Sequence, residues 1–232
     1  MARGKQYQAA SDKIDRTHSY DLEEAIVLAK EAAFAKFDES LDIAIKLGVN
    51  PKHADQMVRG SVSLPNGTGR DVRVLVFCKG EKAKEAQDAG ADYVGDDELI
   101  SKVQDGWTDF DKVVATPDMM GQVGKLGKVL GPRGLMPNPK VGTVSQDVAK
   151  VVKELKAGMI EFRVDKNGII HTTVGKKSFE NGALLENIKA LLDTLVKMKP
   201  ASAKGQYVRG IYLSASQGPS VKLDHSKVVN EL

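Results

Sequence analysis

The sequence contains only one cysteine, Cys78, among its 232 residues. A single thiol excludes an internal disulfide and any metal site built from several cysteines. Long hydrophobic runs are also missing, because the longest apolar stretch, residues 74–78, is far shorter than the roughly twenty residues that a membrane-spanning helix requires. Residues 1–19 carry charges throughout and have no apolar core of a signal peptide. We therefore expect a cytoplasmic protein with no membrane role.

The sequence also lacks the motifs with which many enzymes hold nucleotides or metals. Residues 78–81, after the first apolar run of the middle region, read Cys-Lys-Gly-Glu rather than G-x-G-x-x-G. Gly127-Lys128 is followed by Val129, so no P-loop is present. The histidines lie without the paired spacing of a zinc site, at His18, His53, His171 and His225. We expect no cofactor, no metal and no catalysis; an enzyme that grips a phosphorylated substrate with a basic loop is the rival interpretation.

Acidic residues are absent from positions 119–146, although the net charge of the whole chain is only +3. The cations of this segment are Lys125, Lys128, Arg133 and Lys140. Residues 81–111, by contrast, are predominantly acidic. Such segregation of charge is typical of nucleic-acid-binding proteins. The alternative is a basic face that is merely solvated.

The first stretch of the chain, up to about residue 68, predicts one helix and two strands. Apolar residues within 21–35 recur at helical spacing behind an aspartate that can cap the helix. Residues 37–47 alternate between apolar and polar side chains, which indicates a strand with one face in solvent. Residues 58–64 suggest a second strand, which ends at Pro65-Asn66-Gly67.

The middle stretch, 69–157, alternates short apolar runs with helix-like segments. The runs are 72–77, 93–94 and 113–115, and the predicted helices are 81–89, 96–103 and 146–156. This order predicts a parallel, three-layer α/β unit of the Rossmann-like kind. A segment rich in glycine and proline, 121–142, interrupts it and is predicted to be a shaped loop.

The third stretch begins with a hairpin signal, because residues 160–164 and 169–174 flank Asn167-Gly168, which suits a tight two-residue turn. A helix around 184–195 and a strand at 207–213 follow. The fold class is therefore α/β with two domains. Both chain ends, 1–68 and 158–232, form one discontinuous α+β domain with an antiparallel sheet, and 69–157 is inserted into it. Three separate small units are the alternative.

The loop at 121–142 combines glycine, proline and the four cations named above. Glycine permits close approach of a phosphate, proline limits the entropy lost on ordering, and Lys and Arg neutralise charge. The composition suits contact with an RNA backbone. A structural loop with incidental charge is the alternative.

Residues 130–143 read Leu-Gly-Pro-Arg-Gly-Leu-Met-Pro-Asn-Pro-Lys-Val-Gly-Thr. This run closely resembles the signature of the bacterial large-ribosomal-subunit protein L-one family. The resemblance extends over essentially the whole chain, including residues 36–40, 55–60, 161–163, 165–168 and 218–221. It implies a structural constituent of the large subunit that binds the ribosomal RNA stalk beside the tRNA exit site. It also implies help in releasing deacylated tRNA, repression of translation through binding of its own operon mRNA, and a ribosome-bound protein that is monomeric when free.

The family's main RNA surface maps onto three segments of this chain. The residues are Lys36, Phe37, Ser40 and Lys46, then Arg163, Lys166 and His171, and finally Ser216, Gln217 and Gly218. The family often has Thr-Met-Gly at the last three positions, so this chain keeps the hydroxyl and the glycine but not the thioether. We expect Gly218 to let backbone amides approach RNA closely, whereas core packing is the alternative for Phe37. The low aromatic content, 5%, favours recognition of folded RNA over stacking of single strands. A regulator acting mainly on mRNA is a second rival interpretation.

Overall fold

The structure, a computed structural model, describes residues 4–230. The chain divides into two compact units, which are described separately below. The split unit contains Met1–Gly69 and Ile160–Leu232, and the inserted unit contains Arg70–Met159. Within residues 4–230, no helix has both the length and the apolar composition needed to cross a membrane. The predicted α/β fold class is confirmed, because the split unit has an antiparallel sheet and the inserted unit a parallel one.

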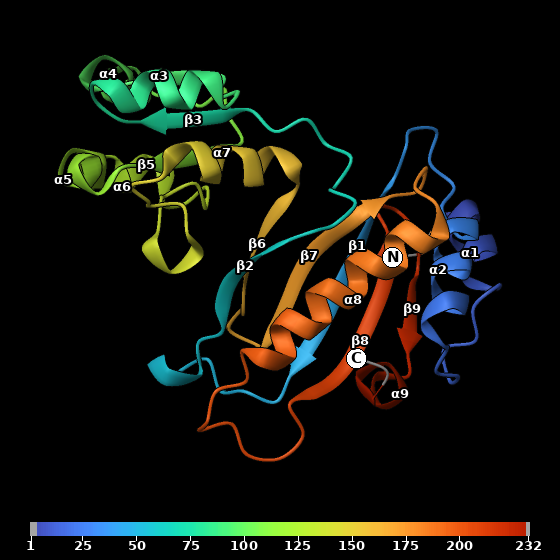
Figure 1. Cartoon of the computed structure of the whole chain (residues 1–232). Coiled ribbons are helices and arrows are strands. Elements are labelled where there is room, and N and C mark those ends of the chain that lie inside the picture. The colour runs from blue at the N-terminus through green and yellow to red at the C-terminus, as the bar shows by residue number, and fades with distance from the viewer. Residues whose placement is uncertain (1–3, 231–232) are drawn as a thin grey trace. The chain divides into compact units, whose positions relative to one another are not determined.

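The sheet of the split unit has the strand order β7-β1-β8-β9 and is antiparallel throughout (Figure 1). The strands are β1 (Ser40–Leu47), β7 (Ile169–Lys176), β8 (Val208–Ala215) and β9 (Ser220–Leu223). The predicted alternation in β1 is confirmed, since Leu41, Ile43, Ile45 and Leu47 are buried and the residues between them are partly exposed. A strand from the first part of the chain thus lies between two strands from the last part.

Two helices cover one face of this sheet (Figure 1). They are α2 (Leu22–Glu31) and α8 (Asn181–Lys197), and their buried residues share one core with the inward side chains of the strands. The predicted first helix ends at Glu31 rather than near residue 35. Asp21 occupies the N-cap position but makes no capping hydrogen bond, because its carboxylate pairs with Lys227. Two shorter helices, α1 (Lys5–Ser11) and α9 (His225–Asn230), complete the unit.

The predicted hairpin of residues 160–174 is wrong in its strand pairing. β6 (Met159–Arg163) pairs with β2 (Arg59–Ser63) in a separate two-stranded sheet, whereas β7 pairs with β1. The chain does turn here, but through Asp165, which accepts hydrogen bonds at Oδ1 from Asn167 N and Ile169 N, both at 2.8 Å. Of the two residues Asn167 and Gly168, only Gly168 has a positive φ, 76°. The tight two-residue turn that Asn-Gly suggested needs a positive φ at both residues, so it is not formed here.

The inserted unit has three parallel strands in the order β4-β3-β5. They are β3 (Val74–Phe77), β4 (Tyr93–Gly95) and β5 (Lys112–Ala115). One core packs α3 (Glu81–Asp88) and α7 (Val148–Ala157) against the sheet, and a second core packs α4 (Asp97–Gln104) against its other face. The three predicted layers are therefore present. Cys78 is buried beside β3 as expected, and this burial raises the pKa of its thiol.

The segment 121–142 is only partly a loop, which corrects the prediction. Its first half forms a series of short helical turns that are α5 (Met120–Val123), η3 (Gly124–Leu126) and α6 (Gly127–Leu130). Buried Val123, Leu126 and Leu130 hold these turns against the sheet. Each glycine costs a helix about 1 kcal/mol relative to alanine, but burial of a leucine or valine contributes about 1.5–3 kcal/mol and outweighs that cost. The second half is irregular except for η4 (Pro139–Val141).

Candidate nucleic-acid interface

The structure brings two predicted segments from opposite ends of the chain into direct contact. Ser40 N, at the start of β1, donates to Ser216 Oγ at 3.1 Å, although the two residues are 176 positions apart. Ser216 Oγ in turn lies 3.3 Å from Ser40 O. This exchange follows from the pairing of β1 with β8, whose register places Leu41 opposite Ala215. Residues 36–40 and 216–218 therefore form one local surface, which we call the loop junction.

A buried carboxylate that the sequence analysis missed ties the loop junction together. Glu39 is fully buried, and its Oε1 accepts from Ala35 N at 2.6 Å while its Oε2 accepts from Gln217 N at 3.0 Å. One side chain thus fixes both loops through backbone amides. A signal was present in the sequence, because Glu39 lies two residues before Leu41 and so falls in phase with the inward-facing positions of β1.

A third segment, residues 176–178 from the end of β7 toward α8, also contacts the loop junction. Lys176 Nζ donates to Ser40 Oγ at 3.0 Å, which places a cation beside a predicted contact residue. Asp38 accepts from Ser178 N at 3.0 Å and from Ser178 Oγ at 2.7 Å. Lys177 N donates to Glu39 O at 2.8 Å, so the backbone on both sides of Ser40 is held. Lys176 was not among the predicted contact residues.

Phe37 projects from the loop junction into solvent with 53% of its surface exposed. This exposure contradicts the alternative that Phe37 packs in the core. Lys36 beside it is also exposed. An exposed phenylalanine next to a lysine offers a ring face and a charge that a nucleotide can contact.

The packing of the protein itself favours glycine at position 218. A Cβ at this position would lie 3.3 Å from Ala32 O and 3.3 Å from the Cβ of Ala215. The glycine therefore allows the β8–β9 turn to pack against the end of α2. Close approach of RNA to Gly218 stays a prediction.

The sheet face that is not covered by α2 and α8 connects the loop junction to the other predicted residues. The β-sheet register places His171 and Tyr212 on either side of Ala44, and Lys222 beside Tyr212. Tyr212 is 39% exposed, and the side chain of His171 is 64% exposed. The sequence analysis missed Tyr212 and Lys222, although the alternation of β8 and β9 would have placed both on the outward face.

The remaining predicted residues gather at the far end of β1. Lys46 Nζ donates to Asn167 O at 2.6 Å, which places Lys46 beside the Asp165–Gly168 turn. Lys46 lies six positions after Ser40, a span of roughly 20 Å at about 3.3 Å per residue. Exposed Arg163 and Lys166 line a hollow together with Lys52 and Met57, neither of which was predicted. The predicted residues thus form a band along the sheet rather than a single spot.

Asp165 organises this far end by its hydrogen bonds. The amides of Ile169 and Asn167 lower the pKa of its carboxyl group, and His171 contributes a further lowering. His171 Nε2 lies 3.9 Å from Asp165 Oδ2. Asp165 therefore stays ionised at neutral pH and holds the turn that carries Lys166.

The four predicted cations of the inserted unit are all exposed. Lys125 and Lys128 lie on helical turns, not in a loop as predicted. Arg133 donates to the hydroxyl of Thr108, and Lys140 N is held by Asn138 Oδ1 at 2.9 Å. The unit therefore presents four cations on a supported backbone.

Comparison with known proteins agrees with this architecture. Residues 29–219 match the Ribosomal protein L1p/L10e family. The chain is also 61% identical over 221 residues to the large ribosomal subunit protein uL1 of Syntrophobacter fumaroxidans, an alignment that covers 95% of this chain and 94% of that protein. The match confirms the predicted resemblance and excludes the rival interpretation of an enzyme. The chain belongs to the ribosomal protein L1p/L10e family and is a non-enzymatic protein of the large ribosomal subunit.

Proposed function

We propose that the split unit is the main RNA-binding domain and that it binds the folded stalk of large-subunit ribosomal RNA through the loop junction and the open sheet face. The observation that carries this proposal is the contact between Ser40 and Ser216, supported by buried Glu39. These bonds hold hydroxyls, amides and an exposed phenylalanine in place before RNA arrives. A preformed surface loses little conformational entropy on binding.

The recognition mechanism follows from the side chains on this surface. Lysine and arginine at both ends of β1 can neutralise phosphates, and serine hydroxyls and backbone amides can bind ribose hydroxyls. Only two exposed aromatic residues, Phe37 and Tyr212, occur among the described residues of this unit, and they lie on different strands or loops. Contacts of this kind read the shape of a folded RNA more than the sequence of a single strand.

A filter-binding experiment tests the proposal. The RNA probe is a transcript of the ribosomal stalk region, and the competitor is an unrelated duplex of the same length. We expect Phe37→Ala and Ser216→Ala to weaken stalk binding at least tenfold, whereas Glu98→Ala, an exposed acid of the inserted unit, leaves it unchanged. Equal affinity of the wild-type protein for the stalk and the unrelated duplex would refute the proposal.

The same surface would serve repression of the protein's own operon mRNA, because a rigid site binds any RNA that presents the same shape. The stalk transcript and the leader of the operon mRNA should then compete for one site. Simultaneous binding of both RNAs would separate the two roles.

The four exposed cations of the inserted unit support a second contact, with tRNA in the exit site. Ribosomes that carry alanine at Lys125, Lys128, Arg133 and Lys140 should release deacylated tRNA at an altered rate. An unchanged release rate would remove tRNA from the proposed partners.

A further inference from the structure

The outer side of α2 carries one exposed apolar side chain among acidic ones. Its inner side is buried, but Glu24, Val27 and Glu31 recur at the spacing of one helical stripe and face outward. Val27 is 40% exposed, which makes it one of four large exposed hydrophobic residues in the range 4–230. A branched apolar side chain therefore stands in water between two carboxylates.

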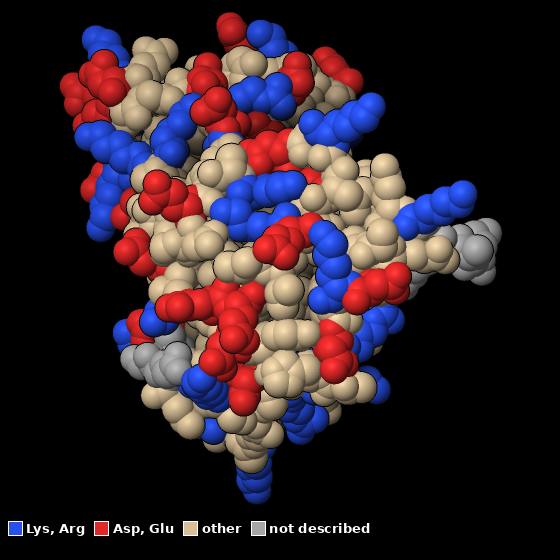
Figure 2. Space-filling model, turned by 90° about the vertical axis from the view of Figure 1, so that its right-hand side faces the viewer, with Lys and Arg blue, Asp and Glu red and all other residues tan. Residues whose placement is uncertain are grey.

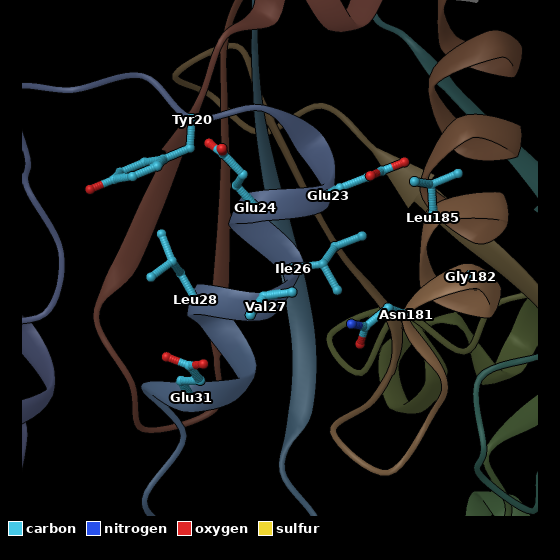
Figure 3. Close-up of a pocket in the computed structure, with 10 residues that line it drawn as sticks. All are labelled: Tyr20, Glu23, Glu24, Ile26, Val27, Leu28, Glu31, Asn181, Gly182 and Leu185. Atoms are coloured by element: carbon cyan, nitrogen blue, oxygen red, sulfur yellow. The ribbon is translucent and has the colours of Figure 1, made fainter.

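A hollow of about 620 Å³ lies over this stripe, between α2 and the first turns of α8 (Figure 3). Ile26, Val27 and Leu28 from α2 and Leu185 from α8 form much of its lining. Gly182 of α8 also lines the hollow, and a Cβ at this position would meet no other atom within 4 Å. The hollow is therefore an apolar groove between two helices, a shape that suits an amphipathic protein segment.

The charged side chains that line the groove are all acidic, although Lys30 and Lys189 lie close to it. Its lining includes Glu23, Glu24 and Glu31 and no lysine or arginine. None of these glutamates forms an ion pair with another described residue. Lys30, on the same helix, instead donates to Phe179 O at 2.7 Å and to Asn181 Oδ1 at 2.8 Å. Figure 2 shows acidic side chains gathered on the face of the molecule that carries α2.

We propose that this groove docks a basic amphipathic segment of another protein. Apolar side chains of that segment would cover Val27, and its lysines or arginines would pair with the three glutamates. The same carboxylates repel phosphates, so RNA does not suit the groove. The groove lies on the helical side of the split unit, away from the open sheet face, although Asn181 follows closely on Ser178, which bonds to Asp38 of the loop junction. RNA on the open sheet face therefore leaves the groove accessible.

Binding of a designed peptide to the full-length protein tests this proposal. The probe carries leucines along one helical stripe with lysines on both sides, and the control peptide has the same composition in scrambled order. Fluorescence anisotropy gives the affinities, and amide chemical shifts give the site. We expect the probe to bind more tightly than the scrambled peptide and to shift amides of residues 20–31 and 181–185.

Matched variants locate the contact. Gly182→Leu fills the groove at a position where the fold has room, and the combined change Glu23→Gln, Glu24→Gln and Glu31→Gln removes its charge. Each should weaken probe binding at least tenfold, whereas Glu85→Gln with Glu98→Gln, two exposed acids of the inserted unit, should not.

Several outcomes would overturn the proposal. They are equal binding of the scrambled peptide, unchanged affinity in the groove variants, displacement of the probe by the stalk transcript, or concentration-dependent shifts at the same amides without peptide, which would make a second copy the occupant. The peptide measurement needs no RNA binding, so its failure is distinct from failure of the proposed function.

Discussion

Replacement of Glu39 by glutamine tests whether the loop junction is held by one buried carboxylate. Glutamine has nearly the same shape, but its amide supplies only one acceptor oxygen. One of the two amides, Ala35 N or Gln217 N, then faces an NH2 group instead of an oxygen. A hydrogen bond to a charged group contributes about 1.5–3 kcal/mol, and an unpaired buried donor costs about 1–3 kcal/mol.

Loss of the buried charge offsets part of this cost, because a desolvated carboxylate is itself unfavourable. We therefore expect Glu39→Gln to lower the free energy of unfolding of the split unit by roughly 1–3 kcal/mol. The effect on RNA binding has a separate origin. If only about a tenth of the molecules keep both loops in the competent arrangement, the apparent Kd rises about tenfold.

Asn187→Ala is the matched control for Glu39→Gln. Asn187 is also fully buried in the split unit, and its amide bonds to Asn66 N at 3.0 Å, Gly67 O at 2.9 Å and Val174 O at 2.8 Å, none of which belongs to residues 36–40 or 216–218. Urea unfolding followed by circular dichroism should show that both variants lose stability. Only Glu39→Gln should also lose affinity for the stalk transcript under conditions where both are folded. An unchanged Kd for Glu39→Gln, or an equal loss for Asn187→Ala, would refute the positioning role.

Three further predictions follow from particular contacts. Lys46→Ala should reduce the slope of log Kd against log salt concentration for RNA by about 1, whereas Lys153→Ala on the inserted unit leaves it unchanged; equal slopes would exclude a phosphate contact at Lys46. Tyr207→Phe should leave stability at pH 7 unchanged or higher, because the buried Tyr207 hydroxyl has no hydrogen-bond partner among residues 4–230. Burial raises the pKa of Tyr207 to about 12, so the native state loses stability as pH rises from 10 through that value, and the phenylalanine variant should unfold at higher pH in an alkaline titration. Gly218→Val should lower both the melting temperature and the affinity for RNA, because the valine side chain would press on Ala32 O. Weakened RNA binding with an unchanged melting temperature would show that contact with RNA, and not packing against α2, requires glycine at this position.

The sequence predicted those elements whose signal is local and periodic. The alternation of β1 was identified because every second residue from Leu41 to Leu47 is apolar. Helical turns in the glycine-rich segment were missed for the opposite reason. Met119, Val123, Leu126 and Leu130 follow helical spacing, but the glycines between them suggested a loop. Burial against the parallel sheet decided the conformation, and that sheet is assembled from residues distant in sequence.

Local patterns could not predict how β6 and β7 pair with other strands. Asn167-Gly168 indicated correctly that the chain turns, but a turn does not determine which strands pair. Val164 N bonds to Val58 O at 2.9 Å, so the chain leaving β6 continues beside the β2 region and not beside β7. The choice depends on partners more than 100 positions away, which no local pattern encodes.

The loop junction could be predicted only in part, because the local sequence indicates a buried acid but not the groups that bind it. An acid in phase with four buried apolar residues, as Glu39 is with Leu41, must find buried donors, since an unpaired carboxylate in a core is strongly unfavourable. That requirement can be read from the sequence alone. The identity of the donors cannot, because Gln217, 178 positions from Glu39, reaches it only after β1 and β8 have paired. An inward-facing acid at the edge of an alternating strand therefore indicates that two segments meet there, and the fold decides which ones.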